Sequence, residues 1–216
     1  MGKMKRTKGI FITIEGGEGS GKTTQSRLLK DYFEEIGRKV LITREPGGTV
    51  FAETIRKLLL NPASHPVPLS ELFLYEAARA QHMQEFILPA LKEGKVVICD
   101  RFTDATIAYQ GYGRKLDLKL ITLLNKEAAF RVSPNLTIYL DIDPQKGLNR
   151  TKNLNKEVYG SDGDRIERES VFFHNNVRKG YLSQAKKYPK RIKIIKTQNT
   201  PLKIFSLIKK YLDAIL

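Results

Sequence analysis

A glycine-rich segment near the N-terminus carries the residue spacing that is most specific for chemistry. It has the pattern G-x-x-x-x-G-K-[ST] and consists of Gly16, Gly17, Glu18, Gly19, Ser20, Gly21, Lys22 and Thr23, followed directly by Thr24. The glycines of such a loop let backbone N–H groups point at phosphate oxygens, the lysine reaches the β and γ phosphates, and the Thr23 hydroxyl can ligate magnesium. The segment therefore predicts a site for a nucleoside triphosphate with Mg²⁺. A glycine-rich turn without a ligand is the alternative.

A second pair of charged residues, Asp100 and Arg101, follows the apolar run Val96–Cys99. On a parallel sheet these side chains emerge at the same carboxyl edge as the glycine-rich loop. Asp100 is suited to the shell of the magnesium ion, and the planar guanidinium of Arg101 to bridging two phosphoryl groups. The alternative is a surface ion pair at a strand end. The loop by itself leaves GTPases, ATPase motors and small-molecule kinases open.

Short apolar runs that alternate with helical patterns must position these residues. Strands are expected at Ile10–Ile14, Lys39–Thr43, Val96–Cys99, Leu136–Leu140 and Arg191–Lys196. Helices are expected at Thr23–Ile36, Phe51–Leu60, between Ser70 and Gly94 with a disturbance at Pro89, at Asp117–Phe130, Pro144–Asn149, Arg165–Lys187, and from Pro201. This alternation predicts an α/β fold, a three-layer sandwich of the P-loop NTPase type with a mainly parallel five-stranded sheet and helices on both faces.

Length and composition set the outer limits. The 216 residues exceed one unit of about 150 residues, but single α/β domains often run longer, so we expect one domain over residues 9–216 after a basic extension, residues 1–8. Hydrophobic residues make up 41% of the chain, which excludes a wholly disordered protein, and no apolar run approaches the roughly 18 residues of a membrane span. The single cysteine, Cys99, cannot form an internal disulfide, so we expect a cytoplasmic protein with a buried, inert thiol.

The net charge and the positions of the histidines limit the classes of ligand that we expect. The 38 Lys and Arg residues against 23 Asp and Glu residues give a net charge of +15, which makes nucleotide phosphates and nucleic acid both candidates. His65, His82 and His174 have no metal-ligand spacing, so each is expected to be a surface or partly packed residue rather than a zinc ligand.

Several segments together resemble one family. The stretches Asp100–Gly111 and Thr43–Thr49 and the glycine-rich loop are similar to those of thymidylate kinases, and Leu74–His82 and Asp164–Glu167 add two further family segments. The resemblance covers nearly the whole chain from Gly9 onward. It implies a bacterial-type enzyme that transfers the γ-phosphoryl group of ATP to dTMP with Mg²⁺, giving dTDP and ADP, in dTTP synthesis for DNA replication. It also implies a homodimer, with nucleotides rather than nucleic acid as the expected partners. The short apolar runs give no reason to expect a membrane partner.

The resemblance further implies an acceptor site for dTMP. The residues carried over are Glu18, Arg44, Pro46, Arg56, Tyr75, Arg79, Arg101, Thr106, Tyr109 and Gln110. Glu18 is expected near the deoxyribose 3′-hydroxyl, and Tyr109 is expected beside the sugar, where it disfavours a 2′-hydroxyl.

The resemblance assigns some arginines of that site to the phosphate of dTMP and another to its base. Arg44, Arg79 and Arg101 are expected around the monophosphate, and Arg56 is expected at a thymine carbonyl. Tyr75 precedes Arg79 by one helical turn and is expected to stack on the base, although an aromatic at helical spacing is more often a core residue. Thr106 and Gln110 are expected as polar base contacts.

The family also closes a lid over the phosphates, and the segment 150–164 is expected to be this lid, a mobile polar loop. Its cations and their neighbours are Arg150, Lys152, Lys156 and Arg165. The catalytic residues that the resemblance implies are Lys22, Arg101, Glu18, Arg150 and Arg165.

Two departures from the family pattern stand out. Relatives often have a shorter, arginine-rich lid, and they commonly have serine at the position of Ala105, where Thr106 can compensate.

Two kinds of function remain as alternatives to phosphorylation of dTMP. One is a kinase for another nucleoside monophosphate or for a deoxynucleoside, and the other is a P-loop ATPase stimulated by nucleic acid.

Overall fold

One parallel sheet organises the molecule. The computed structural model describes residues 8–154 and 163–216, so residues 1–7 of the expected extension and Lys156 of the expected lid lie outside the described residues. The strands are β1 (Ile10–Gly16), β2 (Val40–Arg44), β3 (Val96–Asp100), β4 (Leu136–Asp141) and β5 (Ile192–Lys196). They run in the order β2-β3-β1-β4-β5, and every neighbouring pair is parallel.

Helices connect the strands. They are α1 (Lys22–Glu35), α2 (Val50–Leu60), α3 (Pro68–His82), α4 (Leu88–Lys92), α5 (Thr103–Thr106), α6 (Leu118–Ala128), α7 (Pro144–Leu154), α8 (Val171–Lys187) and α9 (Pro201–Lys209), with π-helical segments η1 (Met83–Ile87) and η2 (Ile107–Gly113). The expected disturbance at Pro89 is confirmed, because η1 lies directly before α4.

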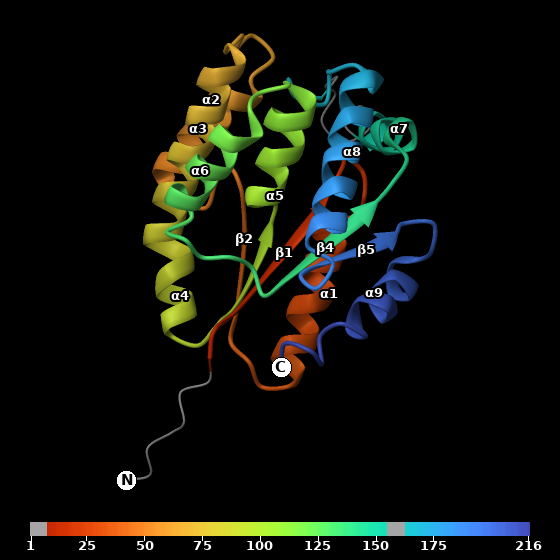
Figure 1. The fold of residues 1–216 in the computed structure, drawn as a ribbon. Helices are drawn as coiled ribbons and strands as arrows, with labels where there is room; N and C mark the ends of the chain where they lie inside the picture. Colours follow the sequence, from red (N-terminus) through yellow and green to blue (C-terminus); the bar gives the residue numbers. More distant parts are fainter. Residues whose placement is uncertain (1–7, 155–162) are drawn as a thin grey trace.

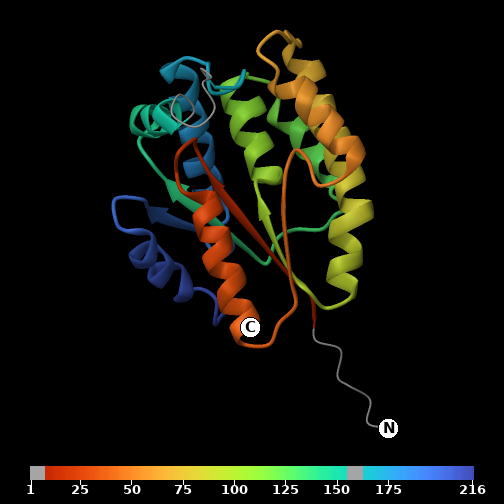
Figure 2. The same ribbon diagram turned by 180° about the vertical axis from the view of Figure 1, so that it is seen from behind.

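Both faces of the sheet are covered. Figure 2 shows α1 and α9 in front of the sheet, where Leu29 and Ile208 pack on the β1 residue Ile12. Figure 1 shows α5 and α8 over the opposite face, where Tyr181 packs on Tyr139 of β4. The expected three-layer α/β fold is therefore confirmed. No helix among the described residues is both long enough and apolar enough to span a bilayer.

The strand register brings the expected functional residues to one edge. Ile14 of β1 pairs with Asp100 of β3, and Arg44 of β2 pairs with the same residue. Gly16, the last residue of β1, pairs with Leu140 of β4. The start of the glycine-rich loop, Arg44 and Asp100 therefore all lie at the carboxyl edge of the sheet. In open parallel sheets, ligands bind at this edge.

The expected element boundaries are wrong around the lid. The helix α7 continues to Leu154, so Arg150 and Lys152 lie on a helix and not in a loop. A polar composition does not exclude a helix, because Arg and Lys are good helix formers when they face solvent. The helix α8 begins at Val171 rather than at Arg165 because the Ser170 hydroxyl caps it and accepts the N–H of Phe173.

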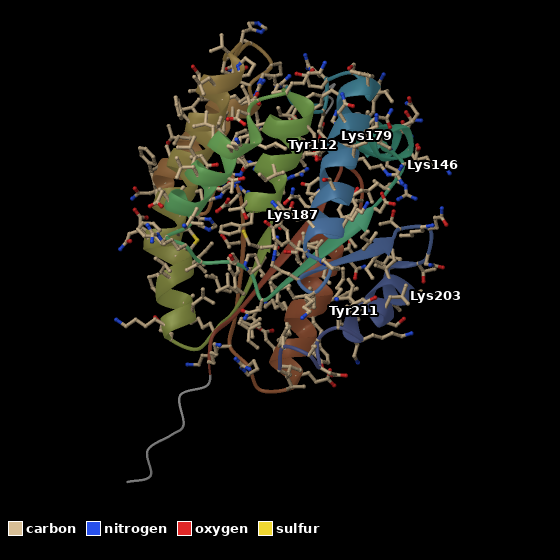
Figure 3. All side chains as sticks on the ribbon, viewed as in Figure 1. Tyr112, Lys146, Lys179, Lys187, Lys203 and Tyr211 are labelled. Carbon is tan, nitrogen blue, oxygen red and sulfur yellow. The ribbon has the colours of Figure 1, made fainter. Side chains whose placement is uncertain are left out.

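Part of the positive charge is spread over the outer surface. Lys146 on α7, Lys179 and Lys187 on α8 and Lys203 on α9 are exposed, and all four are labelled on the face that Figure 3 shows. These lysines do not line the large cavity at the carboxyl edge of the sheet.

Candidate active site

A cavity of about 470 Å³ lies at the carboxyl edge of the sheet, within the size range of small-ligand sites. Most of the site residues that the sequence predicts line it: Glu18, Gly19, Ser20, Gly21, Lys22, Thr23, Thr24, Arg44, Pro46, Arg56, Tyr75, Arg79, Asp100, Arg101, Thr106, Tyr109, Gln110 and Arg150. Ala105 also lines it. Gly16, Gly17 and Arg165 do not.

The glycine-rich loop has the backbone that its sequence requires. Gly19 and Gly21 have φ angles of 64° and 93°, a region that side chains disfavour. The buried ammonium of Lys22 donates to the carbonyl oxygens of Gly16, at 3.3 Å, and Gly17, at 3.2 Å. The helix α1 begins at Lys22, so its free N–H groups and its positive dipole end face the cavity. This arrangement can hold a polyphosphate.

The helix α7 lies directly against this loop. A Cβ atom on Gly147 would stand 2.3 Å from the carbonyl oxygen of Glu18, so only glycine allows the approach. Arg150 follows one helical turn later, lines the cavity and is exposed. A packed helix, and not a loop, therefore delivers this cation.

Arg101 is fixed from several sides. Its backbone has a φ angle of 70°, which a non-glycine residue rarely adopts. Its guanidinium lies 4.9 Å from the ring centroid of Tyr109 and donates to the Tyr181 hydroxyl at 3.3 Å. It also forms an ion pair with Glu18. These contacts hold the guanidinium in one orientation at the cavity wall, which suits the phosphoryl contact expected from the sequence.

Glu18 is ionised within this surrounding. Burial raises its pKa, but Arg101 and Lys22 outweigh burial and lower the pKa of Glu18 to about 2. The Tyr109 hydroxyl donates to Oε1 of Glu18 at 3.2 Å. Glu18 is therefore a hydrogen-bond acceptor at neutral pH, as the expected contact with a sugar hydroxyl requires.

The donor set fits a magnesium ion. Oδ1 of Asp100 is buried and has no hydrogen-bond partner among the described residues, and it lines the same cavity as the Thr23 hydroxyl. Mg²⁺ prefers such oxygen ligands and takes several others from phosphates and water. No group of three or more His, Cys, Asp and Glu side chains that could hold a metal occurs in residues 8–154 and 163–216. A site with few protein ligands is what Mg²⁺ needs when phosphates and water supply the others.

Arg79 is neutralised by a buried network. Its Nε donates to Glu45 at 2.7 Å, and its Nη1 donates to Glu76 at 2.9 Å and to Asn125 at 2.6 Å. Its Nη2 donates to the Thr106 hydroxyl at 3.0 Å. Two carboxylates thus balance one guanidinium, and little positive charge remains for a phosphate.

Arg56 has the opposite surroundings. Its Nη1 donates to the carbonyl oxygen of Pro46 at 2.9 Å, a neutral partner. Burial and the nearby charge of Arg44 lower the pKa of Arg56 more than the carboxylates of Glu53 and Asp164 raise it, so its positive charge is incompletely compensated. Arg44 itself is exposed and pairs with Glu53 at 3.0 Å. An arginine of this kind is poised to bind an anion.

Arg165 is engaged away from the cavity. Its Nη2 donates to Glu71 at 2.5 Å and its Nε donates to the carbonyl oxygen of Leu59 at 2.8 Å. These bonds tie the segment after the lid to α2 and α3. Arg165 therefore does not line the cavity in this structure, and its expected catalytic role stays a prediction.

Sequence reasoning missed four carboxylates: Glu15, Glu45, Glu71 and Asp164. Glu45 and Asp164 line the cavity, and both belong to segments that carry the family resemblance, which is the signal that was available. Glu15 accepts from the Phe102 N–H at 2.7 Å and from the Tyr181 hydroxyl at 2.8 Å. Burial and Asp104 raise the pKa of Glu15 to about 8. No pattern in the sequence pointed to Glu71.

The remaining expectations concern histidines and the cysteine. His65 is exposed, but the expectation of a surface or partly packed residue is wrong for His82 and His174, which are buried. His82 bonds Thr43 at 2.6 Å. Cys99 is buried as expected, and burial raises its thiol pKa.

The chain is similar over most of its length to proteins of one family. The family model described as thymidylate kinase matches residues 14–208. A thymidylate kinase of Syntrophotalea carbinolica is 51% identical over 88% of this chain and 89% of the relative, and one of Pelotomaculum thermopropionicum is 46% identical over 97% of both. A crystal structure of thymidylate kinase from Ehrlichia chaffeensis has a TM-score of 0.77 and 37% identity, covering 95% of this chain and 99% of that one. The chain belongs to the thymidylate kinase family.

Proposed function

We propose that this chain transfers the γ-phosphoryl group of ATP to dTMP, giving dTDP and ADP for dTTP synthesis. The observation that carries the proposal is that one cavity joins a phosphate-binding loop to Arg101, Glu18 and the buried base-side residues. Family membership supports the same reaction.

The donor nucleotide occupies the glycine-rich loop. The backbone N–H groups of residues 16–24 and the start of α1 hold its phosphates, and Lys22 exchanges its bonds to Gly16 and Gly17 for phosphate oxygens. Thr23 and Asp100 hold Mg²⁺, which when bound neutralises phosphate charge. The unpartnered Oδ1 of Asp100 supports the proposal of a Mg²⁺ site here.

The acceptor lies across Arg101 from the donor. Arg56, Arg101 and Arg44 hold the monophosphate of dTMP, and Arg79 faces the base. This exchanges the roles that the resemblance implies for Arg56 and Arg79. The charges support the exchange, because two carboxylates neutralise Arg79 while the charge of Arg56 is incompletely compensated.

The sugar and base are held by the remaining residues. Glu18 accepts from the 3′-hydroxyl, and Tyr109, bonded to Glu18, fills the space beside the sugar. Tyr75 lines the cavity on the same helical face as Arg79 and stacks on the base, while Thr106 and Gln110 contact its edge.

Transfer needs positioning and charge stabilisation and no covalent intermediate. Lys22, Arg101 and Arg150 bring three cations to one cavity, and Arg101 is already oriented by Tyr109 and Tyr181. Fixed cations stabilise charge that develops on the transferring phosphoryl without reorganising during the step.

The active form is a homodimer in the cytoplasm. Exposed apolar side chains on α2, α3 and α6 support the binding of a second copy of this chain. Phe51 is 52% exposed, Phe73 is 50% exposed and Leu123 is 57% exposed. Figure 1 shows these helices on one side of the molecule, where α3 packs on both α2 and α6. The free thiol of Cys99 suits a reducing compartment.

An acceptor panel tests the function. The purified protein is assayed with ATP and Mg²⁺ against dTMP, dUMP, dCMP, AMP, GMP and thymidine, with Lys22→Ala as the inactive control. We expect the highest kcat/KM for dTMP. A preference for AMP, GMP or thymidine would overturn the proposal, as would ATP turnover that requires added DNA or RNA.

A further inference from the structure

Glu71 is a buried carboxylate whose bonding capacity is filled by three neighbours. It lies on α3, is 0% exposed, and precedes Tyr75 and Arg79 by one and two helical turns. Its Oε1 accepts from Gln110 Nε2 at 2.9 Å and from Arg114 Nε at 3.1 Å. Its Oε2 accepts from Arg114 Nη2 at 3.1 Å and from Arg165 Nη2 at 2.5 Å.

These partners make Glu71 an obligatory acceptor. Burial raises its pKa, but hydrogen bonds from Arg114 and Gln110 and the charge of Arg114 outweigh burial, and the net direction is downward. An ionised carboxylate has no proton to donate. Gln110 must therefore turn its amide nitrogen, and not its oxygen, toward Glu71.

This bond decides what Gln110 offers to the cavity. Gln110 is 2% exposed, lies on η2 and lines the cavity next to Thr106. With Nε2 committed to Glu71, the amide oxygen Oε1 has no hydrogen-bond partner among the described residues. The cavity is thus lined by a fixed acceptor rather than by an amide that can turn over.

A fixed acceptor distinguishes between pyrimidine bases. Thymine and uracil carry an N–H donor at N3, whereas N3 of neutral cytosine is an acceptor. Oε1 of Gln110 accepts from the first and repels the lone pair of the second. An amide free to rotate would serve both, because its nitrogen can donate to cytosine.

We propose that Glu71 is a positioning residue that locks the amide orientation of Gln110 and so restricts the acceptor site to imide bases. This inference rests on the proposed function, because it assumes that the pyrimidine base reaches Gln110. Such selectivity follows a general rule, since a site built around one hydrogen-bond pattern rejects an analogue that leaves its polar groups unmatched.

The test compares ratios of kcat/KM for dTMP, dUMP and dCMP. In Glu71→Gln the new amide can donate to Oε1 of Gln110, which turns the Gln110 nitrogen toward the base. We expect the dTMP:dCMP ratio to fall by at least about tenfold, while the dTMP:dUMP ratio stays the same because both bases are imides. Loss of folding alone would lower activity on all three substrates and leave both ratios unchanged.

Two further variants separate orientation from stability. Arg114→Met removes an ion pair from Glu71 but keeps the bond to Gln110, so its dTMP:dCMP ratio should match that of the parent protein. Glu71→Asp keeps the charge for both arginines and retracts the carboxylate from Gln110, so its ratio should fall even if Glu71→Gln does not fold.

The outcomes distinguish this inference from the proposed function. If the parent protein fails to phosphorylate dTMP, the proposed function is wrong, and the inference falls with it. If the parent protein prefers dTMP but every folded Glu71 variant keeps the parental dTMP:dCMP ratio, the inference alone is overturned. A ratio that falls equally in Arg114→Met would also overturn it, because general loosening of the cluster would then explain the effect.

Discussion

The carboxylate of Glu18 and the guanidinium of Arg101 form an ion pair that links the glycine-rich loop to the residue after β3. Their side chains are 19% and 17% exposed, so water screens the pair only partly. In the proposed function this pair marks the boundary between the donor and acceptor nucleotides, because Glu18 belongs to the glycine-rich loop and Arg101 follows β3. If the proposed function holds, the guanidinium of Arg101 binds both Glu18 and a substrate phosphate.

The first prediction concerns the two cations closest to this boundary. Lys22→Ala and Arg101→Ala should fold and should lower kcat by at least about a hundredfold, because each removes a cation aimed at charge that develops during transfer. Steady-state assays with saturating ATP and dTMP measure the effect, and the exposed Lys146→Ala serves as the control. Near-normal kcat in either site variant would mean that the transfer site is elsewhere.

The second prediction separates phosphate from base recognition. Arg56→Ala should weaken dTMP binding by about tenfold or more and leave thymidine binding unchanged, because thymidine lacks the phosphate that we assign to Arg56. Calorimetric titration with both ligands measures this difference. Equal weakening of the two ligands would restore Arg56 to the thymine carbonyl, the role that the family resemblance implies.

The sequence predicted the sheet and the loop well because both depend on local patterns. Apolar runs such as Val96–Cys99 stand out against their polar flanks. The glycine spacing, when it follows a strand and precedes a helix, indicates a phosphate-binding loop. The sequence predicted a loop from Arg150 onward because the composition is polar, but the helix α7 continues there, and Arg150 lies against the glycine-rich loop, where a Cβ atom on Gly19 would stand 3.2 Å from its Cβ atom. Local composition carries no record of that contact.

The site shows the same limit. Residue types identified the arginines, but their roles depend on which carboxylates lie beside them. Arg79 meets Glu45 from a segment 34 residues away, and Arg165 meets Glu71 from 94 residues away. Only the fold brings these charges together, so the proposed division between phosphate and base recognition could not follow from the sequence.

The third prediction concerns the buried carboxyl of Glu15. Its pKa rises from 4.5 to about 8 on folding, so between these pH values the folded protein binds one more proton than the unfolded chain. The stabilisation is fully present below about pH 4.5 and is lost as the pH rises through about 8, at about 1.4 kcal/mol per pH unit.

Urea unfolding across this pH window measures the effect. Glu15→Gln cannot ionise, so its unfolding free energy should fall less steeply with pH than that of the parent protein. The exposed Glu35→Gln should follow the parent profile. Parallel profiles for Glu15→Gln and the parent would contradict a raised pKa at Glu15.

The fourth prediction concerns the contact between α7 and the glycine-rich loop. Gly147→Ala places a methyl group 2.3 Å from the Glu18 carbonyl oxygen, so α7 or the loop must shift. We expect a lower Tm and a higher KM for ATP, whereas the neighbouring Lys146→Ala should change neither. Unaltered ATP kinetics in Gly147→Ala would show that the loop does not depend on α7.

The fifth prediction distinguishes the two arginines that flank the lid. Arg150 is exposed, lines the cavity and lies on a packed helix, so Arg150→Ala should lower kcat by about tenfold to a hundredfold with little change in Tm. Arg165 is bound to Glu71 and Leu59, so Arg165→Ala should instead lower Tm, because it leaves a buried carboxylate with one partner fewer. Thermal unfolding and steady-state kinetics on both variants measure the contrast. If Arg165→Ala lowered kcat with an unchanged Tm, Arg165 would leave Glu71 during turnover and act on the phosphates as the family resemblance implies.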